Sequence, residues 1–320
     1  MATFAARHVG IRFSIVVPTF RRNHSLRECL GALARLDYAR TAFEVIVVDD
    51  GSLDPPTDEV RGFEDLLIVR LVVVTPNAGP AKARNAGAAQ ASGEYLVLMD
   101  DDCVPDPDWL RRFDDRLRDF PRALVGGSLR NGAPESICAE ASQQLVDYLY
   151  RYYNSDHDNA RWFMSANIAC PRAEFLSIGG FGTDFPLAAA EDRDFCDRWR
   201  EAGYRLIMAP RATVSHVRPM SLAKFWQQHR TYGRGAHHLH QARSRRRVRL
   251  PSMEPFAFYL GLMWSPFTDG KGWRSPFLMV LLVLSQLGYA LGYYPERRRA
   301  PLRTEKSRTE EFATSDSPTI

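Results

Sequence analysis

Three adjacent carboxylates, Asp100, Asp101 and Asp102, follow an apolar run at residues 95–99. Like charges this close repel one another and disfavour ionisation. Two interpretations of the triplet are open. It can form a solvated turn, because Asp and Pro are common turn residues. It can instead hold a divalent cation, which favours carboxylate oxygens and offsets the repulsion.

A second acidic pair, Glu191–Asp192, opens an amphipathic stretch that predicts a helix ending at Gly203. Acidic residues in a first helical turn complement the helix dipole, so the pair can be purely structural. His216 lies in residues 205–219, which predict two short strands. A lone histidine is more often a core or surface residue than a ligand. Composition and spacing alone therefore leave both places undecided.

Alternating strands and helices must position these side chains. Apolar runs predict strands at 13–17, 43–48, 66–74 and 94–99. Helical patterns lie between them at 25–36, where Asn23 or Ser25 could act as the cap, and at 79–91. Continuous apolar strands that alternate with helices indicate an α/β fold with a mostly parallel, Rossmann-like sheet covered on both faces.

Ligands of such sheets bind beyond the carboxyl ends of the strands. Polar residues follow three of these ends, in Pro18–Arg21, Asp49–Ser52 and Asp100–Asp102. Neither GxGxxG after the first strand nor GxxxxGK[ST] anywhere is present, which disfavours a dinucleotide fold and a P-loop NTPase. A nucleotide bound at this edge would need other contacts to its phosphates, and a metal ion bound to the triplet would supply them.

Composition narrows the class of protein further. The chain has 320 residues, of which 45% are hydrophobic and 25% charged, as in a globular protein. The net charge of +4 is small, so no nucleic-acid partner is indicated. The five cysteines form no CxxC pair, and we expect them to be buried and free. The N-terminus does not resemble a secretory signal.

The last third changes character. Residues 222–249 predict a strongly basic helix, and residues 254–267 are apolar and aromatic. Residues 277–294 contain eighteen consecutive uncharged residues, near the minimum for crossing a bilayer. Arginines flank this region on both sides, which favours the cytoplasmic face of a membrane. A membrane-dipping hairpin, one span with an interfacial helix and a buried core helix all remain possible. Residues 300–320 are polar and predicted to be disordered.

Four segments occur in the order seen in family 2 glycosyltransferases, which the chain resembles over residues 12–218. They are FSIVVPTFRR, EVIVVDDGSLD, NAGPAKARNAGAAQASGEYLVLMDDDCVPDPDWL and EDRDFCDRWREAGYRL. The resemblance implies a GT-A fold over residues 1–220, with a nucleotide-sugar half at about 12–105 and an acceptor half at about 106–220. A basic and apolar, membrane-associated helical region would follow at 221–299.

The resemblance also implies roles for individual residues. The expected nucleotide-sugar-binding residues are Pro18, Thr19, Arg21, Asp50, Arg84, Asn85, Asp100 and Asp101. Asp100, Asp102 and His216 would hold Mg²⁺ or Mn²⁺ against the diphosphate. Asp192 would be the general base, with Asn167 and Glu191 on the acceptor side.

The implied reaction transfers a sugar with inversion from a UDP-, GDP- or dTDP-sugar to a saccharide or lipid-linked acceptor. A metal would neutralise the leaving diphosphate, and Asp192 would take the acceptor's proton. The implied setting is the cytoplasmic face of a membrane, in cell-envelope or polysaccharide glycan synthesis.

Two departures from the family pattern qualify this expectation. Processive relatives carry QxxRW, whereas the nearest segment here is QQHRTYGRG at 227–235, so addition of a single sugar is favoured over polymerisation. The segment GGFGTDF stands where the family commonly has the motif Gly-Gly-Phe-Asp-Glu, so the role of the acceptor-side loop is less certain.

Two other functions compete with this one. A nucleotidyltransferase also uses acidic metal sites, but it would carry a Gly-rich basic loop after the first strand, and VVPTFRRN has no glycine. A non-catalytic, membrane-bound nucleotide-sugar-binding protein would need the metal site but not a base at Asp192.

Overall fold

The computed structural model describes residues 10–185, 188–248 and 253–299, so the predicted disordered tail lies outside the described residues. One eight-stranded sheet forms the centre, in the order β3-β2-β1-β4-β7-β6-β8-β5. Its strands are β1 (Phe13–Thr19), β2 (Phe43–Asp49), β3 (Val69–Val73), β4 (Tyr95–Met99), β5 (Cys103–Pro105), β6 (Leu124–Asn131), β7 (Asn167–Pro171) and β8 (Leu206–His216).

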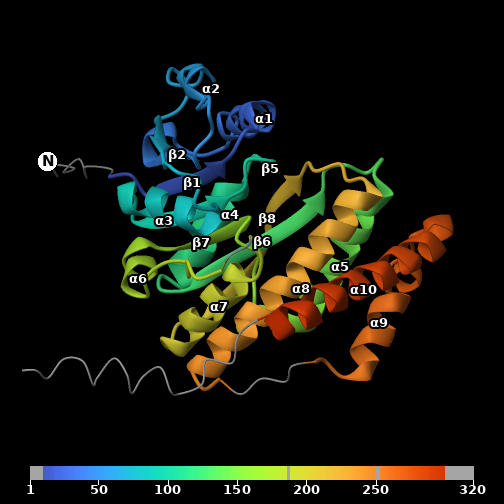
Figure 1. Cartoon of the computed structure of the whole chain (residues 1–320). Helices are drawn as coiled ribbons and strands as arrows, with labels where there is room; N and C mark the ends of the chain where they lie inside the picture. The colour runs from blue at the N-terminus through green and yellow to red at the C-terminus, as the bar shows by residue number, and fades with distance from the viewer. Residues whose placement is uncertain (1–9, 186–187, 249–252, 300–320) are drawn as a thin grey trace, which may run out of the picture.

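The first half of the sheet is parallel, as the sequence predicts. β1 lies between β2 and β4, and β2 also pairs with β3. The strands β1, β2 and β4 are fully buried because helices cover both faces, α1 (Asn23–Leu33) on one side and α3 (Pro80–Gln90) on the other (Figure 1). α1 follows Arg22 and has no side-chain cap, so the prediction of a cap at Asn23 or Ser25 was wrong.

The second half of the sheet is mixed. β7 runs antiparallel to β4 and β6, whereas β8 is parallel to β6 and antiparallel to β5. The prediction of two short strands within 205–219 was wrong, because β8 is a single strand of 11 residues. Its pairing with β6 shifts after Ala209 and resumes at Thr213, so a bulge replaces the expected break.

Shorter and longer helices complete the covering layers. They are α2 (Thr57–Arg61), α4 (Trp109–Asp119), α5 (Ile137–Tyr153), α6 (Arg172–Ser177) and α7 (Glu191–Glu201), with a short 3-10 turn, η1 (Arg40–Ala42), before β2. A helical pattern at residues 107–120 predicts α4, a short strand and a helix expected within 165–182 match β7 and α6, and the acidic stretch ending at Gly203 predicts α7, whereas the sequence does not single out β5, β6 or α5. All five cysteines are buried and free, as expected.

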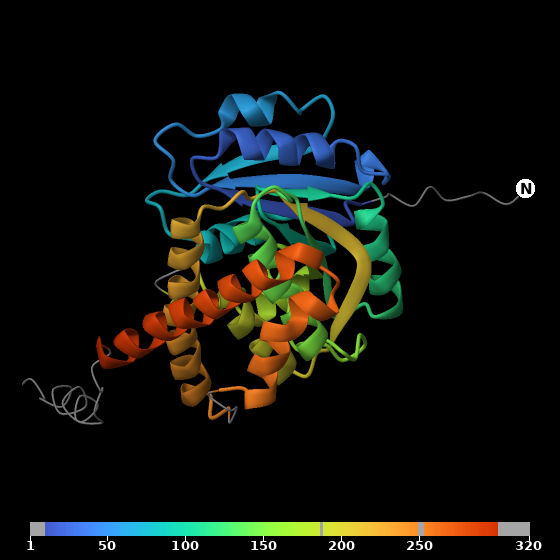
Figure 2. The same cartoon turned by 90° about the vertical axis from the view of Figure 1, so that its right-hand side faces the viewer.

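Three helices form the C-terminal region, namely α8 (Leu222–Arg245), α9 (Phe256–Thr268) and α10 (Ser275–Arg299), with a 3-10 turn, η2 (Gly272–Arg274), between the last two. α10 crosses α8 and also packs on α5 and α9 (Figure 2). Glycines allow the close crossing: a Cβ on Gly233 would lie 1.9 Å from Tyr289 O, and one on Gly292 would lie 2.1 Å from Arg230 O. α10 is therefore fixed to the rest of the molecule along one side.

Candidate active site

The carboxyl ends of β1 and β4 meet at a network of buried charges. Thr19 donates a hydrogen bond of 2.7 Å to Asp101, and Arg22 reaches both Asp101 (3.0 Å) and Asp102 (2.8 Å). Burial raises the pKa of Asp101 to about 6, although Arg22 and Thr19 oppose the shift. Asp101 thus lies in the predicted place, but its carboxylate is already paired within the protein.

Asp102 and His216 meet because β8 pairs with β5, which places His216 opposite Cys103. His216 Nε2 lies 3.0 Å from Asp102 Oδ1. Both atoms are buried, and neither has a hydrogen-bond partner of good geometry among the described residues. Burial alone would raise the pKa of Asp102, but His216 and Arg22 outweigh it and lower the pKa to about 2.

This pair fits a divalent cation. An oxygen of Asp102, the Cys103 thiol and a ring nitrogen of His216 all lie within 4.8 Å of one another. Burial raises the pKa of Cys103 well above its ordinary value, so it stays a neutral thiol. The two remaining donors, a carboxylate oxygen and an imidazole nitrogen, suit Mn²⁺ well and Mg²⁺ through the oxygen.

Arg84 joins this edge to the second acidic pair. Its guanidinium donates to Asp100 at 2.6 Å and lies 3.7 Å from Glu191. Two of its nitrogens, Nε and Nη1, are buried without a hydrogen-bond partner among the described residues. The side chain also lies over the Phe181 ring, at 5.6 Å from its centroid. Arg84 therefore presents unused donors between Asp100 and Glu191, where an anionic ligand could accept them.

Glu191 and Asp192 begin α7. Burial, with the neighbouring charge of Asp192, raises the pKa of Glu191 to about 7. Burial also raises the pKa of Asp192, although Arg193 opposes the shift. The preceding residue, Ala190, has a left-handed backbone with φ of 72°, which is unusual for a residue other than glycine. Strain of this kind tends to gather at functional sites.

Two aromatic side chains near this pair were not predicted. Tyr232 of α8 is half-buried, and desolvation of its hydroxyl raises its pKa to about 12, with the charges of Asp192, Glu191 and Asp100 adding to the shift. Trp162 lies under Arg193, with 4.5 Å between the guanidinium carbon and the ring centroid. Tyr232 lies in QQHRTYGRG, the segment that differs from QxxRW, so that motif does not indicate its position near the acidic pair.

Several predicted residues have other partners in the structure. Asn167 is fully buried and hydrogen-bonded to Trp109, Ser128 and Ala212, so we correct its acceptor-side assignment to a structural one. Asn85 bonds the backbone of Phe181 through both ends of its amide, at 2.9 and 2.8 Å. It holds the turn over which Arg84 packs.

The hydrogen bonds of Asp49 and Asp50, at the end of β2, differ from the expectation that Asp50 binds the nucleotide sugar. Both oxygens of Asp50 accept backbone N–H groups at the start of α3, from Ala78 at 2.9 Å and Gly79 at 2.8 Å. The oxygen without a hydrogen-bond partner among the described residues belongs to Asp49, as its Oδ1. A Cβ on Gly51 would lie 2.6 Å from Asn77 N, so only glycine permits this close approach.

At the end of β1, Pro18 is buried opposite Val48, and Arg21 is exposed with a left-handed φ of 55°. That backbone turn directs Arg22 rather than Arg21 to the acidic triplet. Arg21 lies over Phe20, at 5.0 Å from the ring centroid.

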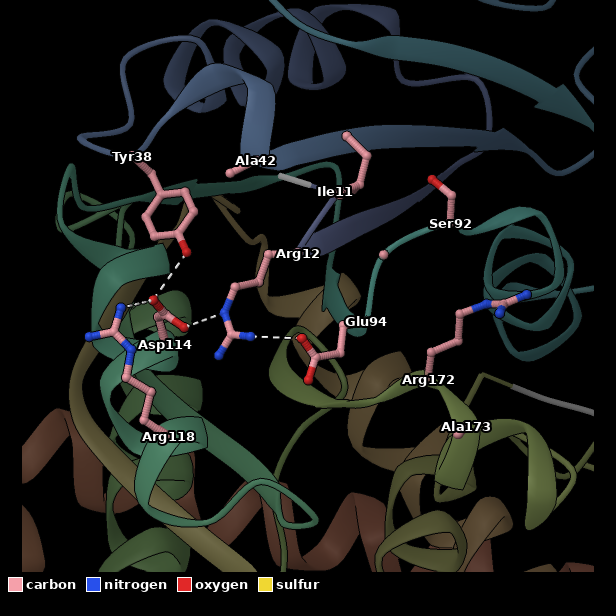
Figure 3. A pocket seen from close by; sticks show the side chains of 12 residues that line it. Ile11, Arg12, Tyr38, Ala42, Ser92, Glu94, Asp114, Arg118, Arg172 and Ala173 are labelled. Atoms are coloured by element: carbon pink, nitrogen blue, oxygen red, sulfur yellow. Dashed lines mark hydrogen bonds and ion pairs between the residues drawn. The ribbon is translucent and has the colours of Figure 1, made fainter. Parts of the chain in front are cut away.

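A cavity of about 910 Å³ lies at the opposite edge of the sheet, beside the start of β1 and the residues just before β4 (Figure 3). Arg12 bridges Asp114 and Glu94 in its wall, and Arg118 and Tyr38 also contact Asp114. Its charged groups are largely paired with one another, and the acidic residues at the carboxyl edge do not line it. This cavity is therefore separate from the candidate site at the carboxyl edge.

Comparison with known families agrees with this geometry. Residues 14–171 match the model described as "Glycosyl transferase family 2", and residues 95–296 match "Glycosyl transferase family group 2". The chain belongs to glycosyltransferase family 2. Its sheet and flanking helices form the GT-A fold that the sequence predicts.

Two curated relatives are 30–33% identical to this chain over the aligned residues. Validoxylamine A glucosyltransferase of Streptomyces hygroscopicus subsp. limoneus is 33% identical over 63% of this chain and 49% of its own length. The pre-mycofactocin glycosyltransferase of Mycobacterium tuberculosis is 30% identical over 70% of this chain and 46% of its own. This glycosyltransferase thus spans about half the length of these relatives.

Solved structures show the same fold at lower identity. A mannosyltransferase from Pyrobaculum calidifontis, determined with GDP-Man and Mn²⁺, has a TM-score of 0.58 at 22% identity and covers 94% of this chain and 80% of its own. TarS of Staphylococcus aureus, determined with UDP-GlcNAc, has a TM-score of 0.51 at 18% identity, covering 91% and 93%. Structures of this fold thus include some determined with nucleotide-sugar donors.

Proposed function

We propose that this chain is a divalent-metal-dependent, inverting glycosyltransferase that moves one sugar from a UDP-, GDP- or dTDP-sugar to an acceptor hydroxyl. The observation that carries the proposal is the position of Arg84, which contacts Asp100 at 2.6 Å and lies 3.7 Å from Glu191. The acidic triplet and the Glu191–Asp192 pair therefore belong to one site, as a donor and an acceptor that react must.

We assign the metal to Asp102 and His216, with Asp100 nearby, because their facing buried atoms lack other good partners among the described residues. When bound, Mg²⁺ or Mn²⁺ would stabilise the charge on the leaving diphosphate. Arg22 and Arg84 contribute fixed positive charge on the same side, and the unused nitrogens of Arg84 can bind phosphate or sugar oxygens.

We assign the general base to Asp192. A carboxylate with a raised pKa is a stronger base than an ordinary one, and the best catalytic pKa lies near the working pH. Burial supplies this shift, and Glu191 adds negative charge beside it. Asp192 takes the proton of the acceptor hydroxyl as its oxygen attacks the anomeric carbon and the bond to the diphosphate breaks.

The acceptor is proposed to be a saccharide or a lipid-linked saccharide, used in cell-envelope or polysaccharide synthesis at the cytoplasmic face of a membrane. Among the described residues, 272–296 form the one stretch long and apolar enough to cross a membrane, and 39% of it is buried against the protein. We place the glycosyltransferase unit in residues 1–220, with halves at 12–105 and 106–220, and the membrane-associated region in 221–299.

Replacement of the base tests the assignment. We expect Asp192→Asn to lower the rate of transfer by about 10²–10⁴-fold, the usual worth of a general base, while donor binding is kept. The measurement is release of nucleoside diphosphate from a panel of UDP-, GDP- and dTDP-sugars with Mn²⁺, with donor binding followed by thermal shift. Asp115→Asn, at an exposed position of α4, is the matched control. Unchanged transfer by the Asp192 variant would refute the role.

A further inference from the structure

The exposed large apolar side chains of this protein gather on α9, α10 and the turn between them. More than half of those in the described residues lie between Met253 and Tyr294. On α9 the exposed residues are Phe256, Leu260, Trp264 and Phe267, spaced as one face of a helix. We call this surface, together with the corresponding stripe on α10, the α9–α10 face.

The stripe on α10 continues the same surface. Phe277, Val280, Leu287, Leu291 and Tyr294 are exposed at helical spacing, between 51% and 56%. The opposite side of α10 is packed on the protein, where Leu278, Leu282 and Ser285 are fully buried. Both helices lie on the same side of the molecule (Figure 2). Neither stripe contains a charged residue.

We propose that the α9–α10 face is a membrane-binding surface that lies in the plane of the bilayer, so that α10 is not a transmembrane span. This inference deepens the proposed function, since it specifies how the site reaches a lipid-linked acceptor. The partner is the lipid surface itself, and its orientation follows from the contacts of α10.

The lipid is favoured as partner by the residues at the rim. Trp264, near the end of α9, and Trp273, in the turn between the helices, are exposed by 61% and 75%. Tryptophan prefers the boundary between hydrocarbon and headgroups. Lys271 and Arg274 lie in this turn and pair with Glu140, and Asp269 of the same turn pairs with Arg151, so the charges at the rim are balanced and the apolar and aromatic side chains are left to meet the lipid.

The in-plane orientation follows from the crossing of α8 and α10. Their backbones approach closely at two places, where Gly233 meets Tyr289 and Gly292 meets Arg230. α10 therefore cannot enter the bilayer without α8. At this crossing α8 carries Arg230, which is exposed, and Arg234, which pairs with Glu296. A span would carry these charges into hydrocarbon, which is strongly unfavourable. An in-plane hairpin buries only the uncharged stripes, as interfacial helices do.

Depth measurements on the full chain test the orientation. Single cysteines at Leu260, Val280, Leu287 and Leu291 carry an environment-sensitive fluorophore, and quenchers sit at known depths in vesicles of phosphatidylcholine with one quarter phosphatidylglycerol. We expect one shallow depth for all four positions. A depth that passes through the bilayer centre along Val280, Leu287 and Leu291 would overturn the proposal in favour of a span.

Vesicle binding by charge variants tests the partner. We expect Trp273→Glu with Leu287→Glu to lower partitioning at least tenfold, and Leu53→Glu, at a fully exposed apolar position outside the face, to leave it unchanged. Failure of the unaltered chain to bind vesicles, or its pairing into a dimer that buries this face, would overturn the proposal. Nucleoside diphosphate release, measured on the same variants, should be unchanged. Its absence even in the unaltered chain would count against the proposed function and not against the surface.

Discussion

Single side chains at the carboxyl edge decide how the proposed base behaves with pH. Arg84, Arg193, Asp100 and Tyr232 surround the Glu191–Asp192 pair, and burial raises the pKa of both acids. A carboxyl group whose pKa is raised to about 7 takes up a proton as the pH falls through 7. The basic form is then lost, and the two acids titrate as a pair.

We therefore expect transfer to fall at acid pH, and to begin falling at a higher pH than an ordinary aspartate would allow, because burial raises the pKa of Asp192. Glu191→Gln removes the neighbouring negative charge, so it should move this acid limb to lower pH by about one unit, since close like charges shift a pKa by that order. The measurement is the pH profile of kcat/KM. Glu201→Gln, at the far end of α7, is the control, and an acid limb that does not move in Glu191→Gln would contradict the coupling.

The sequence indicated most of the site's residues but not how they are used. The triplet, Arg84 and Asp192 were identified from motifs, and they lie at one edge. Arg21 and Arg22 are neighbours in the same motif, so only the left-handed turn at Arg21 decides which one reaches Asp101 and Asp102. Asn167 is a polar residue in the part of the sequence that resembles the family, so the sequence suggests a binding role for it. Its burial and its hydrogen bonds instead depend on three segments that are distant in the sequence.

Among the helices, the crossing of α8 and α10 depends on glycine. A side chain at Gly292 would meet the Arg230 carbonyl, so the helices would have to separate. We expect Gly292→Leu to cost about 1–3 kcal/mol of stability, as overpacking does. The midpoint of thermal unfolding should fall by about 2–4 °C per kcal/mol.

Leu291→Ala is the matched control, because Leu291 is on the same helix and exposed by 54%. It should stay within about 0.5 kcal/mol of the parent, as exposed substitutions do. Both are measured by thermal unfolding in the absence of lipid. Equal midpoints for the two variants would show that the crossing is looser than the backbone distances indicate.

Elements with local patterns were the predictable ones. Apolar runs fixed β1, β2 and β4 to within two residues, because a strand buried on both faces needs an unbroken run. β5, with only three residues, and β6, which contains two adjacent glycines, have no such pattern. β8 looked like two strands because Pro210 interrupts it, whereas a bulge absorbs the proline and keeps the strand in the sheet.

Across the whole molecule, the proposed metal site joins distant parts of the chain. Asp102 follows β4, and His216 ends β8. A ligand that binds only the folded state stabilises it by about 2.7 kcal/mol at one hundred times its Kd. We expect Mn²⁺ to raise the midpoint of thermal unfolding, and chelation to reverse the rise.

His216→Ala should abolish most of this increase, whereas His157→Ala, at an exposed position, should keep it. The readout is the shift in midpoint with Mn²⁺ alone, without donor. An equal shift in both variants would place the ion elsewhere.

The architecture as a whole was predictable from the order of motifs, and the packing of its last third was not. Residues 277–294 are apolar on all sides, and a sequence of this kind cannot show which side meets protein. The answer depends on glycines in two helices that meet only after folding.

One consequence follows from the adjacency of Tyr232 and Gly233 on α8. The charges of the proposed reaction centre act on the pKa of the tyrosine, and the glycine touches α10. Reaction centre and bilayer are thus separated by little more than the thickness of two packed helices, each about 10 Å across. A lipid carrier with a small saccharide head group would present its acceptor hydroxyl at that distance from the bilayer without strain. A carrier with a long glycan would have to fold its chain back toward the surface before its outer end could be extended.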